Sequence, residues 1–428
     1  MMSYDEAINF LYTQLPMFQR AGAPAYKPGL DTSRTLDNAF GNPHKCYRTI
    51  HVAGTNGKGS TAHTIAAVLQ SAGYKVGLYT SPHLVDFRER MRVDGRMISR
   101  EAVVDFVERY RAMSIGVYPS FFELTMMMAF EYFAKEKVDI AVVEVGLGGR
   151  LDSTNIISPI LSVITNISFD HTAFLGDTLP AIASEKAGII KSSIPVVIGE
   201  AEGEVKRVFA DKAAEVGAPI IYAEERRPYT EAVKVDDGYL YRSTPWGDIR
   251  GALSGDCQPR NAATILTALE QLQHIGLNIS GQAVAEGMSD VCRLTGLMGR
   301  WMTLQSSPRV VCDTGHNVGG WEYISRQLAS VATSQLRLVI GFVNDKDITH
   351  ILDLMPRNAK YYFTQASIPR ALAAEEVARI ANEKGLCGTC FPTVAEAYSA
   401  ALAESALNDF IFVGGSTFVV ADLLSSLE

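Results

Sequence analysis

A glycine-rich turn between an apolar run and a helical run limits most tightly how this chain can fold. The apolar run covers residues 49–53, the turn reads Gly54-Thr55-Asn56-Gly57-Lys58-Gly59-Ser60-Thr61, and residues 62–70 have a helical pattern. Glycines let backbone N–H groups approach phosphate oxygens, and the N-terminus of the following helix adds a positive dipole. The segment therefore predicts a strand, a phosphate-binding loop and a helix.

The charged and hydroxyl residues of this turn suit a nucleotide. Lys58 can reach the β- and γ-phosphates, and Ser60 or Thr61 can contact Mg²⁺. Gly59 stands between the lysine and the hydroxyl residue, which departs from the general P-loop pattern. We predict phosphate binding here, and an ordinary strand-to-helix turn is the alternative.

Length, charge and cysteine content restrict the class of protein. A chain of 428 residues predicts two domains, and a net charge of −8 argues against nucleic acid as a partner. The N-terminal residues Met1-Met2-Ser3-Tyr4-Asp5-Glu6 predict no secretory signal, and no apolar run approaches the length of a membrane span. The six cysteines include one C-x-x-C pair, Cys387 and Cys390, and predict reduced thiols in a cytosolic protein.

Most of the chain alternates between strand and helix patterns, which predicts an α/β fold. Continuous apolar runs such as residues 140–143 suit strands that are buried on both faces of a parallel sheet. We expect a first domain over residues 1–295, with a β-ribbon at 224–250 and a long helix at 261–275. Its expected strands cover residues 49–53, 75–80, 139–145, 160–165, 195–198 and 219–222, and its expected helices include 100–113 and 121–135.

A second alternating series follows a linker at residues 293–300, and predicts a smaller Rossmann-like domain over residues 296–428. Its expected strands cover residues 309–313, 336–342, 361–364 and 409–413. Its expected helices cover residues 320–332, 348–355, 374–384, 394–404 and 417–425.

Polar residues at the ends of these strands are candidates for chemistry. Glu144 ends an apolar run, where a carboxylate is unfavourable unless it faces a cation or water, so a Mg²⁺-linked role is favoured over a structural ion pair. His171 lies in a predicted loop, and Lys186 lies in a helical pattern that by itself predicts only an exposed lysine. Asp313 and His316 lie in the turn after the first strand of the second domain, where nucleotide contacts gather in such folds.

The order of these blocks resembles folylpolyglutamate synthase, often bifunctional with dihydrofolate synthase, in the Mur ligase superfamily. The resemblance covers nearly the whole chain and includes the extra glycine of the phosphate loop. It implies a P-loop ATPase domain with a parallel sheet and a smaller Rossmann-like C-terminal domain. The further matching blocks are Thr80-Ser81-Pro82-His83-Leu84, Phe87-Arg88-Glu89-Arg90, Phe121-Phe122-Glu123, residues 144–152, Phe169-Asp170-His171, residues 185–191, Gln258 with Asn261, Gly299-Arg300, Asp313 with His316-Asn317, Asp345-Lys346-Asp347 and Pro369-Arg370-Ala371-Leu372.

The resemblance also implies roles for individual residues. ATP would be held by Gly54, Thr55, Asn56, Gly57, Lys58, Gly59, Ser60, Thr61, Asn261, Arg300 and Asp313. One Mg²⁺ would be bound by Ser81 and Glu144 and a second by His171, Lys186 would carry a carbamate, and His316 would lie near the transferred phosphate. The wall of the pterin site would be formed by Gly29, Leu30, Phe122, Glu123, Leu151 and Asp152.

The implied activity is ATP-dependent ligation of L-glutamate to folates through an acyl phosphate, in folate biosynthesis and one-carbon metabolism. The implied acceptors are tetrahydrofolate, its polyglutamates and dihydropteroate. The implied cofactors are ATP, two Mg²⁺ ions and a monovalent cation. The implied state is a cytoplasmic monomer without a membrane partner. His316 or Arg88 is expected to hold the negative charge of glutamate.

Two other classes of function stay open from the sequence. A peptidoglycan Mur ligase shares the chemistry but usually has a further N-terminal domain, and only about fifty residues precede the phosphate loop here. A non-catalytic ATP-binding switch would need the loop but not Glu144, His171 and Lys186 together. The chain departs from the family at Thr314-Gly315, Ser153 and Val318, where members usually have Gly-Ala, alanine and proline, and these changes bear on substrate detail.

Overall fold

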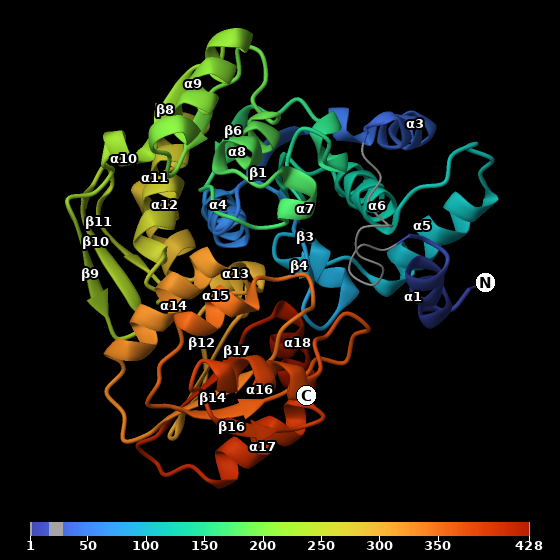
Figure 1. Ribbon diagram of the computed structural model, residues 1–428. Helices are drawn as coiled ribbons and strands as arrows, with labels where there is room; N and C mark the ends of the chain where they lie inside the picture. Colours follow the sequence, from blue (N-terminus) through green and yellow to red (C-terminus); the bar gives the residue numbers. More distant parts are fainter. Residues whose placement is uncertain (1, 17–28, 428) are drawn as a thin grey trace. The chain divides into compact units, whose positions relative to one another are not determined.

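The computed structural model describes residues 2–16 and 29–427, and the chain divides into two compact units (Figure 1). Unit 1 comprises Met1–Ser168, Thr172–Ala252 and Pro259–Leu297. Unit 2 comprises Phe169–His171, Leu253–Gln258 and Met298–Glu428. Unit 2 is therefore built mainly from the C-terminal third of the chain, with two short segments from the middle of the sequence.

The described residues of unit 1 form an eight-stranded sheet in the order β4-β3-β2-β5-β1-β6-β7-β8. The parallel strands are β2, β5, β1, β6, β7 and β8. Strands β3 and β4 pair antiparallel at the edge beside β2. The central position of β1, between β5 and β6, brings the loops that follow these three strands to the same edge of the sheet. The strands are β1 (Arg48–Ala53), β2 (Val76–Tyr79), β3 (Met91–Val93), β4 (Arg96–Met97), β5 (Ile140–Glu144), β6 (Leu161–Ile164), β7 (Val196–Ile198) and β8 (Ile220–Tyr222).

Helices bury both faces of this sheet. Ile50 and Val52 of β1 pack with α4, α11 and α12, while Ala141 and Val143 of β5 pack with α5 and α6 on the other side. Alternate residues of a strand point to opposite faces, which is why these strands read as continuous apolar runs. The helices are α1 (Tyr4–Thr13), α3 (Asp31–Ala39), η2 (Pro43–Cys46), α4 (Lys58–Ser71), η3 (Phe87–Arg90), α5 (Arg100–Ala112), α6 (Phe121–Lys135), η4 (Ser153–Ile156), α7 (Thr172–Leu175), α8 (Leu179–Ala187), α9 (Gly203–Val216), α10 (Ala223–Arg226), α11 (Gln258–His274), α12 (Gly281–Ser289) and α13 (Val291–Thr295).

An antiparallel ribbon of β9 (Glu231–Val235), β10 (Gly238–Thr244) and β11 (Gly247–Gly251) lies beside α12 in Figure 1. Tyr239 and Tyr241 of β10 pack into the core that α12 also enters. The predicted ribbon is confirmed, but its predicted start at residue 224 is wrong. Residues 223–226 form the short helix α10, and the first ribbon strand begins only at Glu231.

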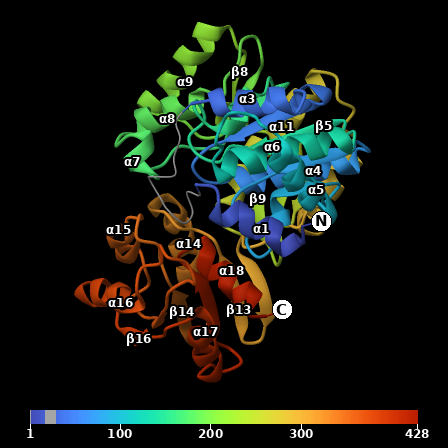
Figure 2. The same ribbon diagram turned by 90° about the vertical axis from the view of Figure 1, so that its right-hand side faces the viewer.

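Unit 2 has a six-stranded sheet in its described residues, in the order β12-β13-β17-β14-β15-β16. Figure 2 labels its strands β13, β14 and β16. Only β12 runs antiparallel to its neighbour. Helices α14, α15 and α16 pack on the face that carries Leu338, Ile340 and Phe412. The elements are β12 (Met302–Ser306), β13 (Arg309–Asp313), α14 (Val318–Ser330), β14 (Leu336–Ile340), α15 (Ile348–Asp353), β15 (Lys360–Phe363), α16 (Ala374–Glu383), β16 (Gly388–Cys390), α17 (Val394–Ala403), β17 (Phe410–Gly414) and α18 (Thr417–Ser425).

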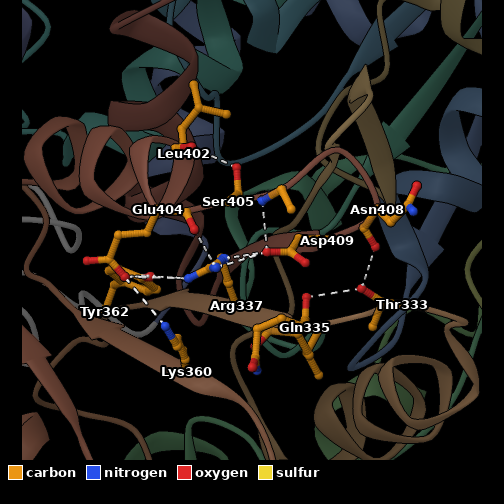
Figure 3. A network of polar contacts seen from close by, with 12 residues as sticks. Thr333, Gln335, Arg337, Lys360, Tyr362, Leu402, Glu404, Ser405, Asn408 and Asp409 are labelled. Atoms are coloured by element: carbon orange, nitrogen blue, oxygen red, sulfur yellow. Dashed lines mark hydrogen bonds and ion pairs between the residues drawn. The ribbon is translucent and has the colours of Figure 1, made fainter.

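A buried ionic network supports the amino ends of these strands (Figure 3). The Arg337 guanidinium donates to Oδ2 of Asp409 from Nε at 3.0 Å and from Nη2 at 2.9 Å, and its Nη1 donates to the Tyr362 hydroxyl at 2.7 Å. Nη2 also donates to the Glu404 carbonyl at 2.6 Å. Since both side chains of the Arg337–Asp409 pair are about 5% exposed or less, neither charge is compensated by bulk water.

The predicted α/β class and the two alternating series are confirmed. The sequence pattern missed the antiparallel edge strands β3, β4 and β12 and the short strand β16, and the expected linker at 293–300 begins inside α13. Across the part of the chain that the structure describes, every helix is too short or too polar to cross a bilayer.

Candidate functional site

The glycine-rich loop after β1 forms a cradle that admits no side chain. Gly54 and Gly57 have φ angles of +143° and +81°, which L-residues rarely adopt. A Cβ on Gly54 would lie 1.8 Å from Oγ1 of Thr165, and a Cβ on Gly57 would lie 2.3 Å from Oδ1 of Asn261. The loop at the N-terminus of α4 thus presents bare backbone, which fits the binding of a polyphosphate. Asn261, on α11, reaches this loop with its amide.

The loop is held by the segment that follows β6. The Thr55 amide donates to the Asn166 carbonyl, and the Asn56 amide donates to the Asn166 side chain, both at 2.9 Å. The Ser168 carbonyl accepts from the Thr55 hydroxyl at 3.1 Å. Sequence reasoning missed Asn166 and Ser168. The available signal was their position directly after the predicted strand 160–165, beside the strand that carries the loop.

Lys58 opens α4 and folds back over the loop. Its Nζ donates to the Thr55 carbonyl at 3.0 Å, so the ammonium group lies at the cradle that it would share with phosphate oxygens. Ser60 and Thr61 follow in the first turn of the helix and are both buried. The hydroxyl of Thr61 has no hydrogen-bond partner among the described residues.

Ser81 and Glu144 lie together at the carboxyl ends of β2 and β5, which are parallel neighbours. The Ser81 amide donates to Oε2 of Glu144 at 3.4 Å, and the Glu144 side chain is buried. A hydroxyl and a carboxylate are oxygen ligands of the kind that Mg²⁺ takes, and Mg²⁺ usually completes its shell with water and phosphate oxygens. The two residues therefore fit such an ion, although the described residues contain no group of three or more acidic, His or Cys side chains that could enclose a metal.

Lys186 is buried, with 4% of its surface exposed, so the exposed lysine expected from the helical pattern is wrong. The glycine-rich turn after Glu144 packs against the end of α8 that carries this lysine. The Arg150 amide donates to the Glu185 carbonyl at 2.7 Å, and a Cβ on Gly149 would lie 3.0 Å from the Cα of Lys186. This lysine is therefore buried in the tertiary structure, at a point where a glycine turn packs closely against its backbone.

The expected pterin wall draws on the starts of α3 and α6 and on the turn before η4. The Phe122 ring covers Gly146, whose added Cβ would meet it at 2.4 Å. Ser120 is the N-cap of α6, and Glu123 completes its capping box, with Oε2 accepting from the Ser120 amide at 2.7 Å. Oε1 of Glu123 accepts from the Ser33 hydroxyl of α3 at 3.4 Å. Gly29, with a φ of +122°, and Leu30 precede α3 directly.

Asp152 forms the N-cap of η4, and Leu151 stands just before it. Oδ2 of Asp152 accepts from the Leu147 amide at 2.8 Å, and Oδ1 accepts from the Thr154 amide at 3.0 Å. Burial raises the pKa of this carboxyl, and the hydrogen bonds from Thr154 and Leu147 oppose the shift. In this structure both Asp152 oxygens brace the turn.

Within unit 2, Asp313 fixes the turn after β13. Its Oδ2 accepts from the Trp301 amide at 2.7 Å, and its Oδ1 accepts from the Gly315 amide at 2.8 Å. Burial raises the pKa of this carboxyl, and the Arg300 charge lowers it in opposition. Arg300 donates to the hydroxyl of Thr314 and to the Gly299 carbonyl, so the two expected nucleotide contacts share one turn.

Asp170 gathers a cluster of polar groups in unit 2. It accepts from Lys346 Nζ at 2.5 Å and from Asn317 Nδ2 at 3.0 Å, and His316 Nε2 lies 3.4 Å away. Burial alone would raise the Asp170 pKa, but the His316 hydrogen bond and the nearby positive charges outweigh it and hold the pKa well below its usual range. Burial also lowers the pKa of His171 to about 3, so its imidazole is neutral, as a metal ligand requires.

The expected site residues thus fall into two groups. Unit 1 holds the phosphate loop, Asn261, Ser81, Glu144, Lys186 and the pterin wall, while unit 2 holds Arg300, Asp313, His316 and His171. The second expected metal ligand, His171, is therefore grouped with His316 rather than with Ser81 and Glu144.

Comparison with known families identifies both parts of the chain. The family described as Mur ligase middle domain matches residues 52–252. The family described as Mur ligase, glutamate ligase domain matches residues 299–417.

Relatives that match most of this chain have names that include the family that the motifs resemble. The dihydrofolate synthase/folylpolyglutamate synthase of Bacillus subtilis is 33% identical over 100% of this chain and 99% of its own length. The protein of that name from Escherichia coli is 34% identical over 88% of this chain and 86% of its own length. A Haloferax volcanii protein, described as a probable bifunctional folylpolyglutamate synthase/dihydropteroate synthase, is 34% identical, and this chain spans 50% of it.

Solved structures agree with these relatives. E. coli FolC in complex with DHPP and ADP superposes with a TM-score of 0.85 and 31% identity, over 100% of this chain and 98% of that chain. A bifunctional folylpolyglutamate synthase/dihydrofolate synthase with Mn, AMPPNP and L-glutamate bound superposes with a TM-score of 0.80 and 30% identity, over 94% and 95% of the two chains.

Proposed function

Because this chain belongs to the dihydrofolate synthase/folylpolyglutamate synthase family of Mur ligases, we propose that it uses ATP to join L-glutamate to folates. The observation that carries the proposal is the bare phosphate cradle of Gly54 and Gly57, in the same unit as the buried Glu144 and Lys186. A nucleotide switch would need the cradle alone. Glu144 is a buried carboxylate at the carboxyl end of β5, the neighbour of β1, and Lys186 is a buried lysine whose backbone packs against the turn after β5. Both suit phosphoryl transfer to an acceptor.

The reaction follows from the weak reactivity of a carboxylate. The acceptor's carboxylate oxygen takes the γ-phosphoryl group of ATP, which gives an acyl phosphate and ADP. The amino group of L-glutamate then attacks the acyl carbon, the carbon–oxygen bond to phosphate breaks, and the amine loses a proton as the amide forms. Lys58 and the loop N–H groups offset charge on the transferred phosphoryl group.

Metal ions would supply further charge neutralisation when bound. Ser81 and Glu144 would hold one Mg²⁺ and His171 a second, and Lys186 would serve as a carbamate, whose negative charge suits a metal ligand. The relative solved with Mn and AMPPNP supports a divalent ion, and a monovalent cation is part of the same proposal. The nucleotide would be held by residues 54–61 and by Asn261, Arg300 and Asp313.

In this proposal the first domain, predicted as residues 1–295, binds the phosphates of ATP, and the second, predicted as residues 296–428, carries Arg300, Asp313 and His316. In the described structure, residues 169–171 and 253–258 group with the second unit. Folates would lie against Gly29, Leu30, Phe122, Glu123, Leu151 and Asp152. His316 would lie near the transferred phosphate, and His316 or Arg88 would hold the negative charge of glutamate. Each already faces a carboxylate, since Arg88 Nη2 is paired with Asp86 at 2.6 Å and His316 Nε2 lies 3.4 Å from Asp170.

The acceptors in this proposal include dihydropteroate as well as tetrahydrofolate and its polyglutamates, since FolC of E. coli was solved with DHPP. We also propose a cytoplasmic monomer. The six cysteines are all free thiols, which fits a reducing compartment.

The test is a product assay with ATP, Mg²⁺, L-glutamate and either dihydropteroate or tetrahydrofolate. We expect phosphate release that requires both glutamate and a pterin, and a product one glutamate heavier in each case. Phosphate release that is indifferent to glutamate would contradict the ligase and favour a switch. Extension of only one pterin would restrict the enzyme to a single activity.

A further inference from the structure

His51 lies in the middle of β1, three residues before the phosphate loop, and is fully buried. Its neighbours Ile50 and Val52 face the core formed with α4 and α11. By strand alternation the imidazole points to the other face of the sheet. There its Nε2 lies 2.9 Å from Oγ1 of Thr154, in η4.

The carboxylate of Asp152 determines which group donates in the two hydrogen bonds that link it, through Thr154, to His51. The Thr154 hydroxyl donates to Oδ1 of Asp152 at 2.5 Å, because a carboxylate can only accept. The one hydroxyl hydrogen is thereby used, so Oγ1 must accept from His51 Nε2–H. The histidine is then the Nε2–H tautomer. Its Nδ1 is a buried acceptor without a hydrogen-bond partner among the described residues, which agrees with an imidazole that carries a single proton.

The chain of donors ends on the turn that carries the expected folate wall. Asp152 also accepts from the Leu147 amide at 2.8 Å, and the Asn155 side chain donates to the Arg150 carbonyl at 3.1 Å. Leu151 and Asp152 therefore lie in a turn, residues 147–155, that is held by hydrogen bonds between its own residues. The contact from Thr154 to His51 ties that turn to the strand at the centre of the sheet.

We propose that His51 is a positioning residue for the folate substrate, acting through Thr154 on Asp152 and the turn of residues 147–155. The proposal rests on the folate ligase function above. A histidine suits this place because burial lowers its pKa to about 3, so it stays a neutral donor across the physiological range. An aliphatic side chain would leave the Thr154 oxygen without its donor and the turn free to shift.

The effect should separate the two substrates. The backbone of β1 is paired on both sides, His51 with Val143 of β5 and with Ser162 of β6, so the strand and its phosphate loop keep their place without the imidazole. The turn at 147–155 has no such ladder. Loss of the His51 hydrogen bond should therefore raise the KM for the pterin and leave the KM for ATP nearly unchanged.

The experiment compares His51→Leu with His63→Leu in the full-length enzyme. His63 is a matched control, because it is also buried in unit 1 and its Nδ1 lies 2.8 Å from the hydroxyl of Thr295. We expect His51→Leu to raise the KM for dihydropteroate about tenfold, with the KM for ATP within about twofold of wild type. An unchanged pterin KM, or an equal rise in His63→Leu, would overturn the proposal.

Variants of Thr154, the residue between His51 and Asp152, test the series of hydrogen bonds if His51→Leu does not fold. Thr154→Val should raise the pterin KM as His51→Leu does, and Thr154→Ser, which keeps the hydroxyl, should recover most of the loss. A Thr154→Ser variant as poor as Thr154→Val would contradict the hydrogen-bond chain. Failure of the ligase function itself is distinguishable, since wild-type protein would then form no glutamate-dependent product.

Discussion

Replacement of Gly57 by alanine tests the phosphate cradle at its tightest point. The residue has a φ of +81°, and the new Cβ would lie 2.3 Å from Oδ1 and 3.1 Å from Cγ of Asn261. The loop can relieve the strain only by moving away from this conformation, and the amide of Asn261 must shift as well. Both changes displace groups that we assign to the nucleotide.

The size of the effect is the sum of two contributions. A left-handed conformation costs an L-residue about 1–2 kcal/mol, and this strain returns when ATP draws the loop into its binding conformation. Loss of the one hydrogen bond that we expect Asn261 to make with the nucleotide contributes about 1 kcal/mol. The total of about 2.5 kcal/mol corresponds to a fall of ~60-fold in kcat/KM for ATP.

Gly73 provides a control with the same backbone and an empty neighbourhood. Its φ is +90°, and a Cβ there would meet no atom within 4 Å. Gly73→Ala should reduce the free energy of unfolding by about 1 kcal/mol, measured by urea denaturation, and leave the ATP kinetics unchanged. If Gly57→Ala kept kcat/KM for ATP within about twofold of Gly73→Ala, the contact of the loop with Asn261 would have no role in nucleotide binding.

Lys58→Ala should lower kcat ~10²- to 10³-fold without loss of helical circular dichroism, as removal of a transition-state charge stabiliser does, and near-normal turnover would contradict its role. Lys186→Ala should be inactive and partly restored by acetate; an unmodified lysine mass on gently purified wild type would argue against the carbamate. Asp409→Ala should reduce the free energy of unfolding by about 3 kcal/mol, at the lower end for a broken buried pair because Glu404 remains near Arg337, and a loss below about 1 kcal/mol would refute that account. Because the pKa of Asp170 is depressed in the folded state, its ionised carboxylate stabilises the fold fully above the unfolded pKa of about 4, and this stabilisation is lost as pH falls toward the folded pKa. Asp170→Asn should therefore flatten the acid side of a plot of unfolding free energy, measured in urea, against pH. An unchanged slope there would exclude this linkage.

The sequence predicted the elements whose signal is local. A run of apolar residues with a glycine turn and a helix pattern is complete within about twenty residues, and β1 lies where the pattern put it. Helix α4 was also predicted, but it begins at Lys58, four residues before the predicted helix at 62–70, so the second half of the predicted turn is helical. The missed strands β4 and β16 have two and three residues, which is too short for an alternating pattern to be visible. Strand β12 was hidden for another reason, since its burial is only partial and it pairs at an edge.

Much of the site geometry depends on contacts between distant segments. Lys186 is buried, and its backbone packs against a glycine turn some forty residues earlier in the chain; no pattern within α8 signals either feature. Asn166 reaches the phosphate loop only because β6 is the spatial neighbour of β1. The family resemblance supplied the assignments of these blocks, and the relatives confirm the family, whereas the individual ligand roles stay predictions.

Unit 2 is not a continuous piece of the chain, and this bears on any attempt to divide the protein into fragments. Gln327 of α14 is buried and donates to the Ser254 carbonyl at 3.0 Å, while its Oε1 accepts from the Asp256 amide at 2.8 Å. A fragment that begins near Met298 would leave this amide without either partner and Lys346 without Asp170. Gene dissection at the sequence boundary would therefore damage the C-terminal piece, and a circularly permuted chain that keeps residues 169–171 and 253–258 attached would be the sounder way to study it.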